Sequence, residues 1–168
     1  EATGYGLCYF TQAMMERNGK TIAGKTVVVS GSGNVAIYAV QKITEMGAKV
    51  VAMSDSNGYI YDPDGIKLDI IKDIKLVKRG RIKEYAAQVP GSTYTEGFRG
   101  IWTIPCDIAL PCATQNEITA AEAEEIVKGG AMAVAEGANM PSTPEAIEEF
   151  LKAKICLLYT SDAADEAR

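Results

Sequence analysis

The segment Thr26–Ala36 constrains the fold of this chain most, because it joins a strand pattern to a helix pattern through two glycines. Three consecutive valines, Val27–Val29, form the continuous apolar run that is typical of a strand buried on both faces of a parallel sheet. The sequence Gly31-Ser-Gly-Asn-Val-Ala follows at once, and apolar residues then recur at helical spacing up to Met46. The segment therefore predicts a strand, a tight turn and a helix in direct succession.

The glycine turn has the spacing of a dinucleotide-binding motif. Gly31 permits the tight turn, Gly33 lets the backbone approach a pyrophosphate, and Ala36 keeps the helix close to the sheet. The helix N-terminus offers free N–H groups and the positive end of its dipole to phosphates. This spacing alone is a weak signal, but a second strand at Lys49–Met53 completes a βαβ unit and strengthens the interpretation. The alternative is a strand–helix turn whose small residues serve packing only.

Asp55 follows the second strand, where a carboxylate usually binds a ribose 2′-hydroxyl. It therefore indicates a dinucleotide, and alone it would favour NAD. Ser54 and Ser56 flank it, and basic residues follow at Lys75, Lys78, Arg79 and Arg81. Because a 2′-phosphate requires several donors and a positive partner, the set favours NADP, provided that Asp55 turns its carboxylate towards backbone N–H groups. An Asx turn followed by a solvated basic helix face is an equally weighted alternative on spacing alone.

The composition limits the classes of function. The 168 residues suffice for one domain with a sizeable core, and the formal net charge of −5 argues against non-specific nucleic-acid binding. No apolar run is long enough for a membrane span, and no N-terminal signal pattern is present. Histidine is absent, which excludes a Ser–His or Cys–His nucleophile pair and a His-ligated metal within this chain. The four cysteines lack Cys-x-x-Cys spacing, which is typical of reduced, buried thiols in a cytosolic protein.

The rest of the chain alternates between helix and strand patterns. We expect helices over residues 7–17, 34–46, 68–79, 82–88, 119–128 and 144–153, and strands over 26–30, 49–53, 106–111 and 131–135. This order predicts an α/β fold that is Rossmann-like and doubly wound, with a mostly parallel sheet and helices on both faces.

Local signals suggest several boundaries and turns. Thr3–Gly6 predicts a cap and turn, and residues 59–65 predict a short β-turn excursion. Residues 81–100 are rich in loop signals, and Ile101-Trp102 is expected to begin a β element. The N-caps of the last two helices are expected at Thr119 and at residue 142 or 143.

Three strand ends carry small or polar residues, namely Ser30-Gly31, Cys112–Asn116 and Glu136–Asn139. Ligands of open α/β sheets bind at the carboxyl edge, where such strand ends meet. We therefore expect a ligand site at this edge.

Five motifs resemble, in unbroken order, the nucleotide-binding domain of a hexameric bacterial-type glutamate dehydrogenase. They are Thr3-Gly-Tyr-Gly, Gly31-Ser-Gly-Asn-Val-Ala, Ser54-Asp-Ser-x-Gly, Asp107-Ile-Ala-Leu-Pro-Cys-Ala-Thr-Gln-Asn-Glu and Ala135-Glu-Gly-Ala-Asn-Met-Pro. The resemblance covers residues 1–155 and implies a dinucleotide-binding domain there, with NADP as cofactor and NAD as the alternative. It further implies hydride transfer that interconverts L-glutamate with 2-oxoglutarate and ammonia, in a cytoplasmic homohexamer when full-length.

The resemblance also implies roles for individual residues. Thr3 and Asn139 would lie by the nicotinamide end, and Asn34 by the pyrophosphate. Ala113-Thr114 would lie by a ribose, and Ser56 with Lys75 or Lys78 by the 2′-phosphate. The cofactor-binding candidates are Thr3, Gly31, Ser32, Gly33, Asn34, Val35, Asp55, Ser56, Lys75, Ala113, Thr114 and Asn139.

Two departures from the family pattern limit what the chain is expected to do. The family's catalytic lysine and aspartate and most of its glutamate-binding residues precede the first residue here, on a substrate domain. We therefore expect no catalytic residue in this chain and no activity from it alone. Residues 156–168 match nothing in the family pattern and are interpreted as a non-native tail outside the fold, a real acidic tail being the alternative. The rival function is a non-catalytic dinucleotide-binding module that senses redox state through a partner.

Overall fold

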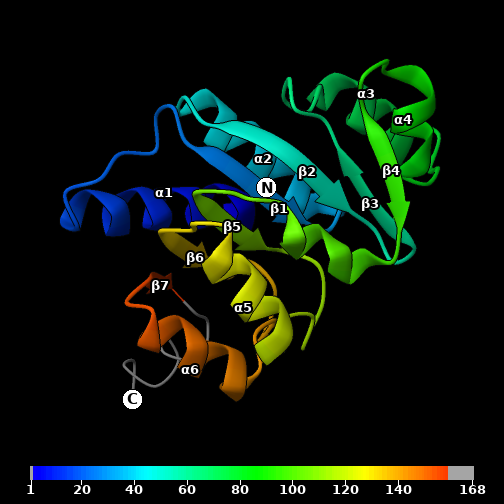
Figure 1. The fold of residues 1–168 in the computed structure, drawn as a ribbon. Helices are drawn as coiled ribbons and strands as arrows, with labels where there is room; N and C mark the ends of the chain where they lie inside the picture. Colours follow the sequence, from blue (N-terminus) through cyan, green and yellow to red (C-terminus); the bar gives the residue numbers. More distant parts are fainter. Residues whose placement is uncertain (1, 159–168) are drawn as a thin grey trace.

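A computed structural model describes residues 2–158 and shows a seven-stranded sheet in the order β4-β3-β2-β1-β5-β6-β7 (Figure 1). The strands are β1 Thr26–Ser30, β2 Lys49–Ser54, β3 Gly58–Tyr61, β4 Thr93–Glu96, β5 Ile108–Pro111, β6 Ala133–Ala135 and β7 Cys156–Leu158. The pairings among β2, β1, β5, β6 and β7 are parallel, whereas β3 pairs antiparallel with β2 and with β4. The sheet is mostly parallel, as the sequence predicts.

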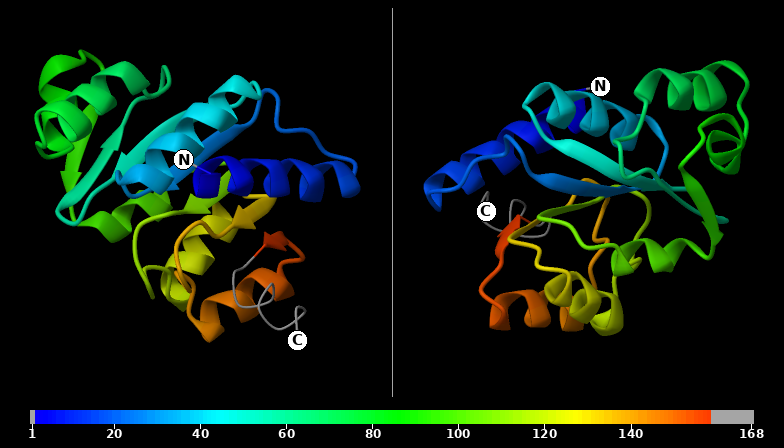
Figure 2. Two further views of the ribbon diagram at one scale, coloured as in Figure 1. Left: turned by 180° about the vertical axis from the view of Figure 1, so that it is seen from behind. Right: turned by 45° about the horizontal axis from the view of Figure 1, so that its top comes forward.

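Helices cover both faces of the sheet (Figure 2). They are α1 Ala2–Arg17, α2 Asn34–Glu45, α3 Leu68–Lys72, the π-helix η1 Asp73–Val77, α4 Lys83–Gln88, the 3₁₀-helix η2 Phe98–Thr103, α5 Ala120–Lys128 and α6 Pro144–Lys152. The helices α1, α2, α3 and α4 pack on one face, and η2, α5 and α6 pack on the other. None of the helices within residues 2–158 has the length and apolar character that a membrane crossing requires.

Alternate valines of β1 contribute to two separate hydrophobic cores. Val27 and Val29 pack in the same core as Ile37 of α2, whereas Val28 packs in the core that contains Phe150 of α6. All three valines are fully buried. Successive side chains of a strand point to opposite faces, so a strand covered on both sides needs apolar residues at every position. This confirms the interpretation of the valine run.

The chain connects β1 to strands on its two opposite sides, and this reversal of strand order locates the expected ligand site. The chain passes from β1 through α2 to β2 on one side of β1, and later returns to β5 on the other side. In open α/β sheets, the loops at such a reversal separate and leave a crevice beyond the carboxyl ends of the strands. The fold therefore predicts a ligand site above β1, between the ends of β2 and β5.

Two local predictions were wrong. Thr3–Gly6 does not form a cap and turn but lies within α1, where an added Cβ on Gly4 would sit 2.8 Å from the Val35 carbonyl oxygen. The glycine thus serves close packing of α1 on α2. Ile101 and Trp102 belong to η2 rather than to a β element, and both are buried against the face that carries Val28.

β3 falls in the predicted β-turn excursion, whereas two other strands lie where no β structure was predicted. β4 falls in the stretch expected to be loop-rich; it is an edge strand paired with β3, and its largely exposed side chains give no apolar alternation. Residues 156–158, assigned to a tail outside the fold, form β7 and pair with β6 in the register Val134–Leu157. Residues 159–168 lie outside the described residues, so the non-native origin of the tail stays a prediction.

The expected N-caps identify the starts of α5 and α6. Thr119 and Glu122 form a capping box, in which Glu122 Oε1 accepts from the Thr119 N–H at 3.0 Å. Thr143, and not Ser142, caps α6, because its hydroxyl accepts from the Ala146 N–H at 3.2 Å. Pro144 occupies the first turn of α6, as predicted.

Candidate functional site

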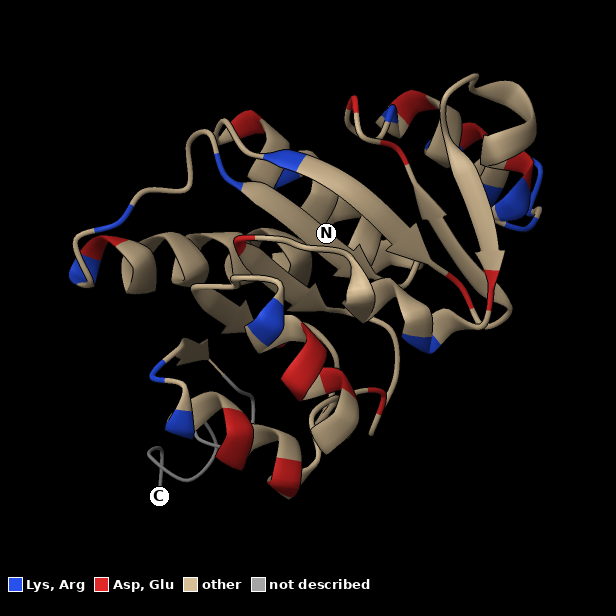
Figure 3. Cartoon of the chain, viewed as in Figure 1, with Lys and Arg blue, Asp and Glu red and all other residues tan. Residues whose placement is uncertain are grey.

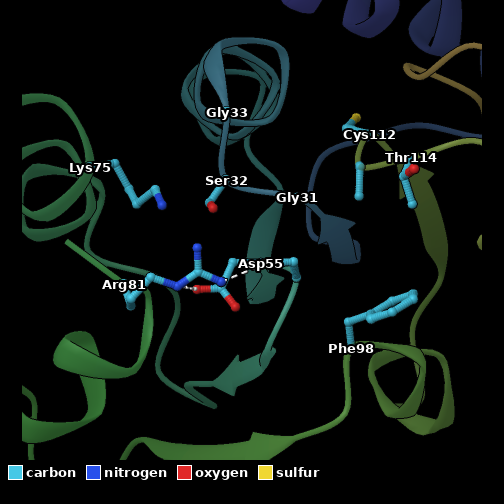
Figure 4. A pocket seen from close by; sticks show the side chains of 11 residues that line it. Gly31, Ser32, Gly33, Asp55, Lys75, Arg81, Phe98, Cys112 and Thr114 are labelled. Atoms are coloured by element: carbon cyan, nitrogen blue, oxygen red, sulfur yellow. Dashed lines mark hydrogen bonds and ion pairs between the residues drawn. The ribbon is translucent and has the colours of Figure 1, made fainter. Parts of the chain in front are cut away.

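A cavity of about 400 Å³ lies at the carboxyl ends of β1, β2 and β5 (Figure 4). Its lining residues are Gly31, Ser32, Gly33, Asp55, Ser56, Lys75, Arg81, Phe98, Cys112, Ala113 and Thr114. The volume is within the usual range for small-molecule sites. The cavity occupies the crevice that the strand order predicts.

Eight of the twelve candidate residues line this cavity. The remaining four are Thr3, Asn34, Val35 and Asn139. Asn34 and Val35 begin α2 directly beside the lining residue Gly33, whereas Thr3 and Asn139 are exposed and lie in α1 and in the loop after β6. The structure thus brings together the candidates that follow β1, β2 and β5.

Glycine occupies the two positions of the turn for different structural reasons. Gly31 has φ +91°, and an added Cβ would meet the Cys112 carbonyl oxygen at 2.8 Å. Gly33 has φ −80° and ψ −170°, which any residue adopts, and no atom lies within 4 Å of an added Cβ. The fold therefore requires glycine at position 31, whereas Gly33 leaves open space against the backbone at the cavity wall.

The N-terminus of α2 faces the same turn. Gly33 is its N-cap and has no side chain that could accept from the first N–H groups of the helix. The first N–H groups of any helix lack intrahelical partners, and together with the helix dipole they favour a bound anion. The turn and the helix start supply the features of a phosphate site.

The Asp55 carboxylate is bound within the protein. Its Oδ1 accepts from the N–H groups of Asn57 at 2.9 Å and Gly58 at 3.2 Å, and its Oδ2 accepts from the Ile82 N–H at 3.0 Å. Three backbone N–H groups therefore bind this carboxylate, and Asp55 as a whole residue is 9% exposed. The condition stated for NADP binding, a carboxylate turned towards backbone N–H groups, is met.

Two basic side chains supply positive charge beside Asp55. Arg81 Nε lies 3.3 Å from Asp55 Oδ2, and Arg81 Nη2 donates to Ser56 Oγ at 2.8 Å. Lys75 lies on the π-helix η1 and lines the cavity, whereas Lys78 forms an ion pair with Asp73 at 3.1 Å and is not among the lining residues. Figure 3 shows basic and acidic residues interspersed around α3 and α4, and several acidic residues on α5 and α6.

Three lining residues were not among the candidates. Arg81 belongs to the basic set noted in the sequence, but its distance of 26 residues from Asp55 gives no spacing signal. Phe98 comes from η2, which was not predicted as a helix, and Cys112 directly precedes the candidate Ala113. The sequence held a signal for two of them, because Arg81 belongs to the basic set that favours NADP and Cys112 begins a strand end at which a ligand was expected; Phe98 carried no such signal.

The buried thiols have raised pKa values, and of the cysteines that the structure describes Cys112 alone lines the cavity. Burial raises the pKa of Cys8 and Cys106 to about 12, and it also raises the pKa of Cys112. A thiol with a raised pKa carries little thiolate, the form that acts as a nucleophile. Three cysteines are buried as predicted, whereas Cys156 is half-buried.

Glu117 links the ends of β1 and β5 beneath the cavity. Its Oε1 accepts from Ser30 Oγ at 2.8 Å and from the Ala113 N–H at 3.2 Å, and Ser30 Oγ accepts from the Cys112 N–H at 3.0 Å. Burial raises the pKa of the Glu117 carboxyl, although these hydrogen bonds oppose the shift. The network holds the residue 112–114 backbone that forms one cavity wall.

Glu117 should make stability fall with rising pH. Because its folded-state pKa lies above the ordinary 4.5, the native chain holds the proton more tightly than the unfolded chain, and this stabilisation is lost as the pH rises through the raised pKa. We expect the free energy of unfolding of Glu117→Gln to fall less over this range, because glutamine keeps an acceptor oxygen without a charge. Urea unfolding from about pH 2 to 8 measures this, and it also covers the acid range in which Glu122 titrates.

Glu122 is the matched control, because its pKa is shifted in the opposite direction to that of Glu117. Burial acts to raise its pKa, but hydrogen bonds from Thr119 and Arg99 outweigh it, and the net shift is downward. The stabilisation by Glu122 is therefore lost as the pH falls, and Glu122→Gln should lose less stability towards acid. Parallel pH profiles for wild type and both variants would contradict these assignments.

Comparison with known proteins identifies the family. The sequence matches the family described as Glutamate/Leucine/Phenylalanine/Valine dehydrogenase over residues 1–165. The chain belongs to this family. Membership agrees with the strand–turn–helix motif and with the placement of the cavity, and it confirms the resemblance inferred from the five motifs.

Individual members of the dehydrogenase family are similar over most of this chain. The NADP-specific glutamate dehydrogenase of Haemophilus influenzae is 56% identical over 158 residues, which cover 92% of this chain and 35% of that protein. The NAD(P)-specific glutamate dehydrogenase of Xylanibacter ruminicola is 55% identical over 170 residues, covering 99% and 37%. The solved structure of Plasmodium falciparum glutamate dehydrogenase 2 superposes with a TM-score of 0.90 at 43% identity, covering 94% and 35%. The chain thus spans about a third of the length of these family members.

Proposed function

We propose that residues 1–155 are the nucleotide-binding domain of an NADP-dependent glutamate dehydrogenase. The observation that carries this proposal is the state of Asp55, whose carboxylate is held by three backbone N–H groups while Arg81 and Lys75 lie in the same cavity. A free carboxylate at this position would favour ribose hydroxyls and repel a phosphate. Here backbone N–H groups bind the carboxylate, and the charges of Arg81 and Lys75 together exceed that of Asp55 by one positive charge, which favours a 2′-phosphate.

The residues present fit a dinucleotide along the cavity. Gly31–Asn34 and the start of α2 would hold the pyrophosphate, because Gly33 leaves space that a Cβ would fill. Ala113 and Thr114 would lie by a ribose, and Ser56, Lys75 and Arg81 by the 2′-phosphate. Thr3 and Asn139 would lie towards the nicotinamide end, and Val35, in the first turn of α2, would lie beside the pyrophosphate. When bound, NADP supplies the acceptor or donor of a hydride, and this chain's residues bind and orient it.

The whole protein is proposed to interconvert L-glutamate with 2-oxoglutarate and ammonia. The relatives named above are glutamate dehydrogenases about three times as long, which leaves room for a separate substrate domain. We assign no catalytic residue to this chain, and place the catalytic lysine and aspartate on that substrate domain. The full-length enzyme is proposed to be a cytoplasmic homohexamer.

Activity assays of the chain and of the full-length protein test this function. We expect the chain to bind NADP⁺ without oxidising L-glutamate, because hydride transfer requires an amino acid held against the nicotinamide by groups of a second domain. The full-length protein should reduce NADP⁺ with L-glutamate and prefer it to L-leucine, L-phenylalanine and L-valine. Turnover by the chain alone, or a preference of the full-length protein for one of the other three amino acids, would contradict the proposal.

A further inference from the structure

Asp55 and Arg81 form a partly buried ion pair at the cavity wall. The Asp55 side chain is 5% exposed and the Arg81 side chain 43% exposed, with Nε 3.3 Å from Oδ2. The same Oδ2 accepts from the N–H of Ile82, the residue after Arg81. Asp55 therefore contacts both the side chain of residue 81 and the backbone directly after it.

Ser56 supplies a second anchor for the guanidinium. Arg81 Nη2 donates to Ser56 Oγ at 2.8 Å, so neighbouring residues after β2 hold the Nε and Nη2 sides of one arginine. A guanidinium carries five N–H donors in a rigid plane, so two contacts fix its orientation and leave further donors. Figure 4 shows the Arg81 guanidinium beside the Asp55 carboxylate, with Lys75 and Ser32 facing the same space.

We propose that Asp55 is a positioning residue for a 2′-phosphate, acting through Arg81. The carboxylate holds the guanidinium at the cavity wall, so that its remaining N–H groups meet the phosphate without the arginine being ordered during binding. This inference rests on the proposed function and extends it, because it assigns to the acidic residue a role that favours the phosphorylated cofactor. It opposes the simple expectation that a carboxylate beside a phosphate weakens binding.

The decisive variant is Asp55→Asn, measured by calorimetric titration of NADP⁺ and NAD⁺ into the 168-residue chain. Asparagine keeps Oδ1 as an acceptor for the turn, but its NH₂ group replaces Oδ2, so the variant loses both the charge that holds Arg81 and the acceptor for the Ile82 N–H. We expect NADP⁺ to bind about threefold to tenfold more weakly, the range for ordering one long side chain on binding. NAD⁺ lacks the 2′-phosphate, so its affinity should change little. Equal loss of affinity for both nucleotides would show that Asp55 is only structural and would overturn the inference.

The effect of Asp55→Asn on NADP⁺ affinity should change sign when Arg81 is absent. In an Arg81→Ala background, Asp55 has no arginine to position, and its charge only repels the phosphate. Asp55→Asn should therefore strengthen NADP⁺ binding in that background while weakening it in the wild type. A gain in NADP⁺ affinity in both backgrounds would establish repulsion and overturn positioning. Asp73→Asn is the matched charge control, because Asp73 pairs with Lys78 and does not line the cavity.

A second variant covers the case in which Asp55→Asn does not fold. Arg81→Lys keeps the positive charge, but an ammonium lacks the planar fork that contacts Asp55 and Ser56 together. It should lose most of the preference for NADP⁺ over NAD⁺, and an unchanged preference would overturn the inference. Failure of the wild-type chain to bind either nucleotide would instead contradict the proposed function, and the inference with it.

Discussion

Replacing Gly33 with valine is expected to weaken NADP⁺ binding by at least about 100-fold. A valine side chain would occupy the space where the backbone must approach the pyrophosphate, in which no protein atom lies within 4 Å of an added Cβ. Two lost hydrogen bonds to a charged group, at about 1.5–3 kcal/mol each, account for this factor or more. Stability should fall by no more than about 1 kcal/mol, because φ −80° and ψ −170° suit a β-branched residue although valine is a poorer N-cap than glycine.

Calorimetric titration of NADP⁺, together with circular dichroism and urea unfolding, measures both effects. Gly33→Ala is the graded control, because one methyl group intrudes less and should give a smaller loss of affinity. A folded Gly33→Val chain that binds NADP⁺ as tightly as the wild type would show that the pyrophosphate does not occupy the space beside Gly33.

Replacing Gly31 with alanine should instead lower the free energy of unfolding by about 2–4 kcal/mol. A non-glycine residue at φ +91° is strained by about 1–3 kcal/mol, and the new Cβ would meet the Cys112 carbonyl oxygen at 2.8 Å. Urea unfolding measures the loss, with Gly33→Ala as a matched control that should stay within about 0.5 kcal/mol. Similar losses at both positions would refute the distinction between a glycine required by the fold and one that leaves room for a ligand.

Local sequence patterns correctly predicted strands that are buried on both faces and helices that begin with an N-cap residue. The valine run gave β1 correctly because both faces of that strand are covered, and Thr119 gave the start of α5 because its capping box is local in sequence. The edge strand β4 escaped because exposed side chains need not alternate. Ile101 and Trp102 were misassigned because two adjacent apolar residues do not distinguish a strand from a short helical turn.

Some features of the candidate site could likewise be predicted from the sequence, and others could not. The spacing of Gly31, Gly33 and Asp55 located the cavity, since these residues follow adjacent strands of one βαβ unit. The direction of the Asp55 carboxylate and its contact with Arg81 depend on the fold of the segment between them, so the sequence does not report them. Likewise, the π-helix η1 places Lys75 rather than Lys78 at the cavity, and helical spacing does not anticipate a π-helix.

The comparison of NADP⁺ with NAD⁺ tests the central claim, that this cavity binds the phosphorylated dinucleotide. Titration of both into the chain at two salt concentrations should give tighter NADP⁺ binding, by about 10-fold to 100-fold at low salt, for one net charge-assisted contact. The preference should shrink as salt rises, because screening weakens the attraction between the phosphate and the two cations. Equal affinities, or tighter binding of NAD⁺, would contradict the account.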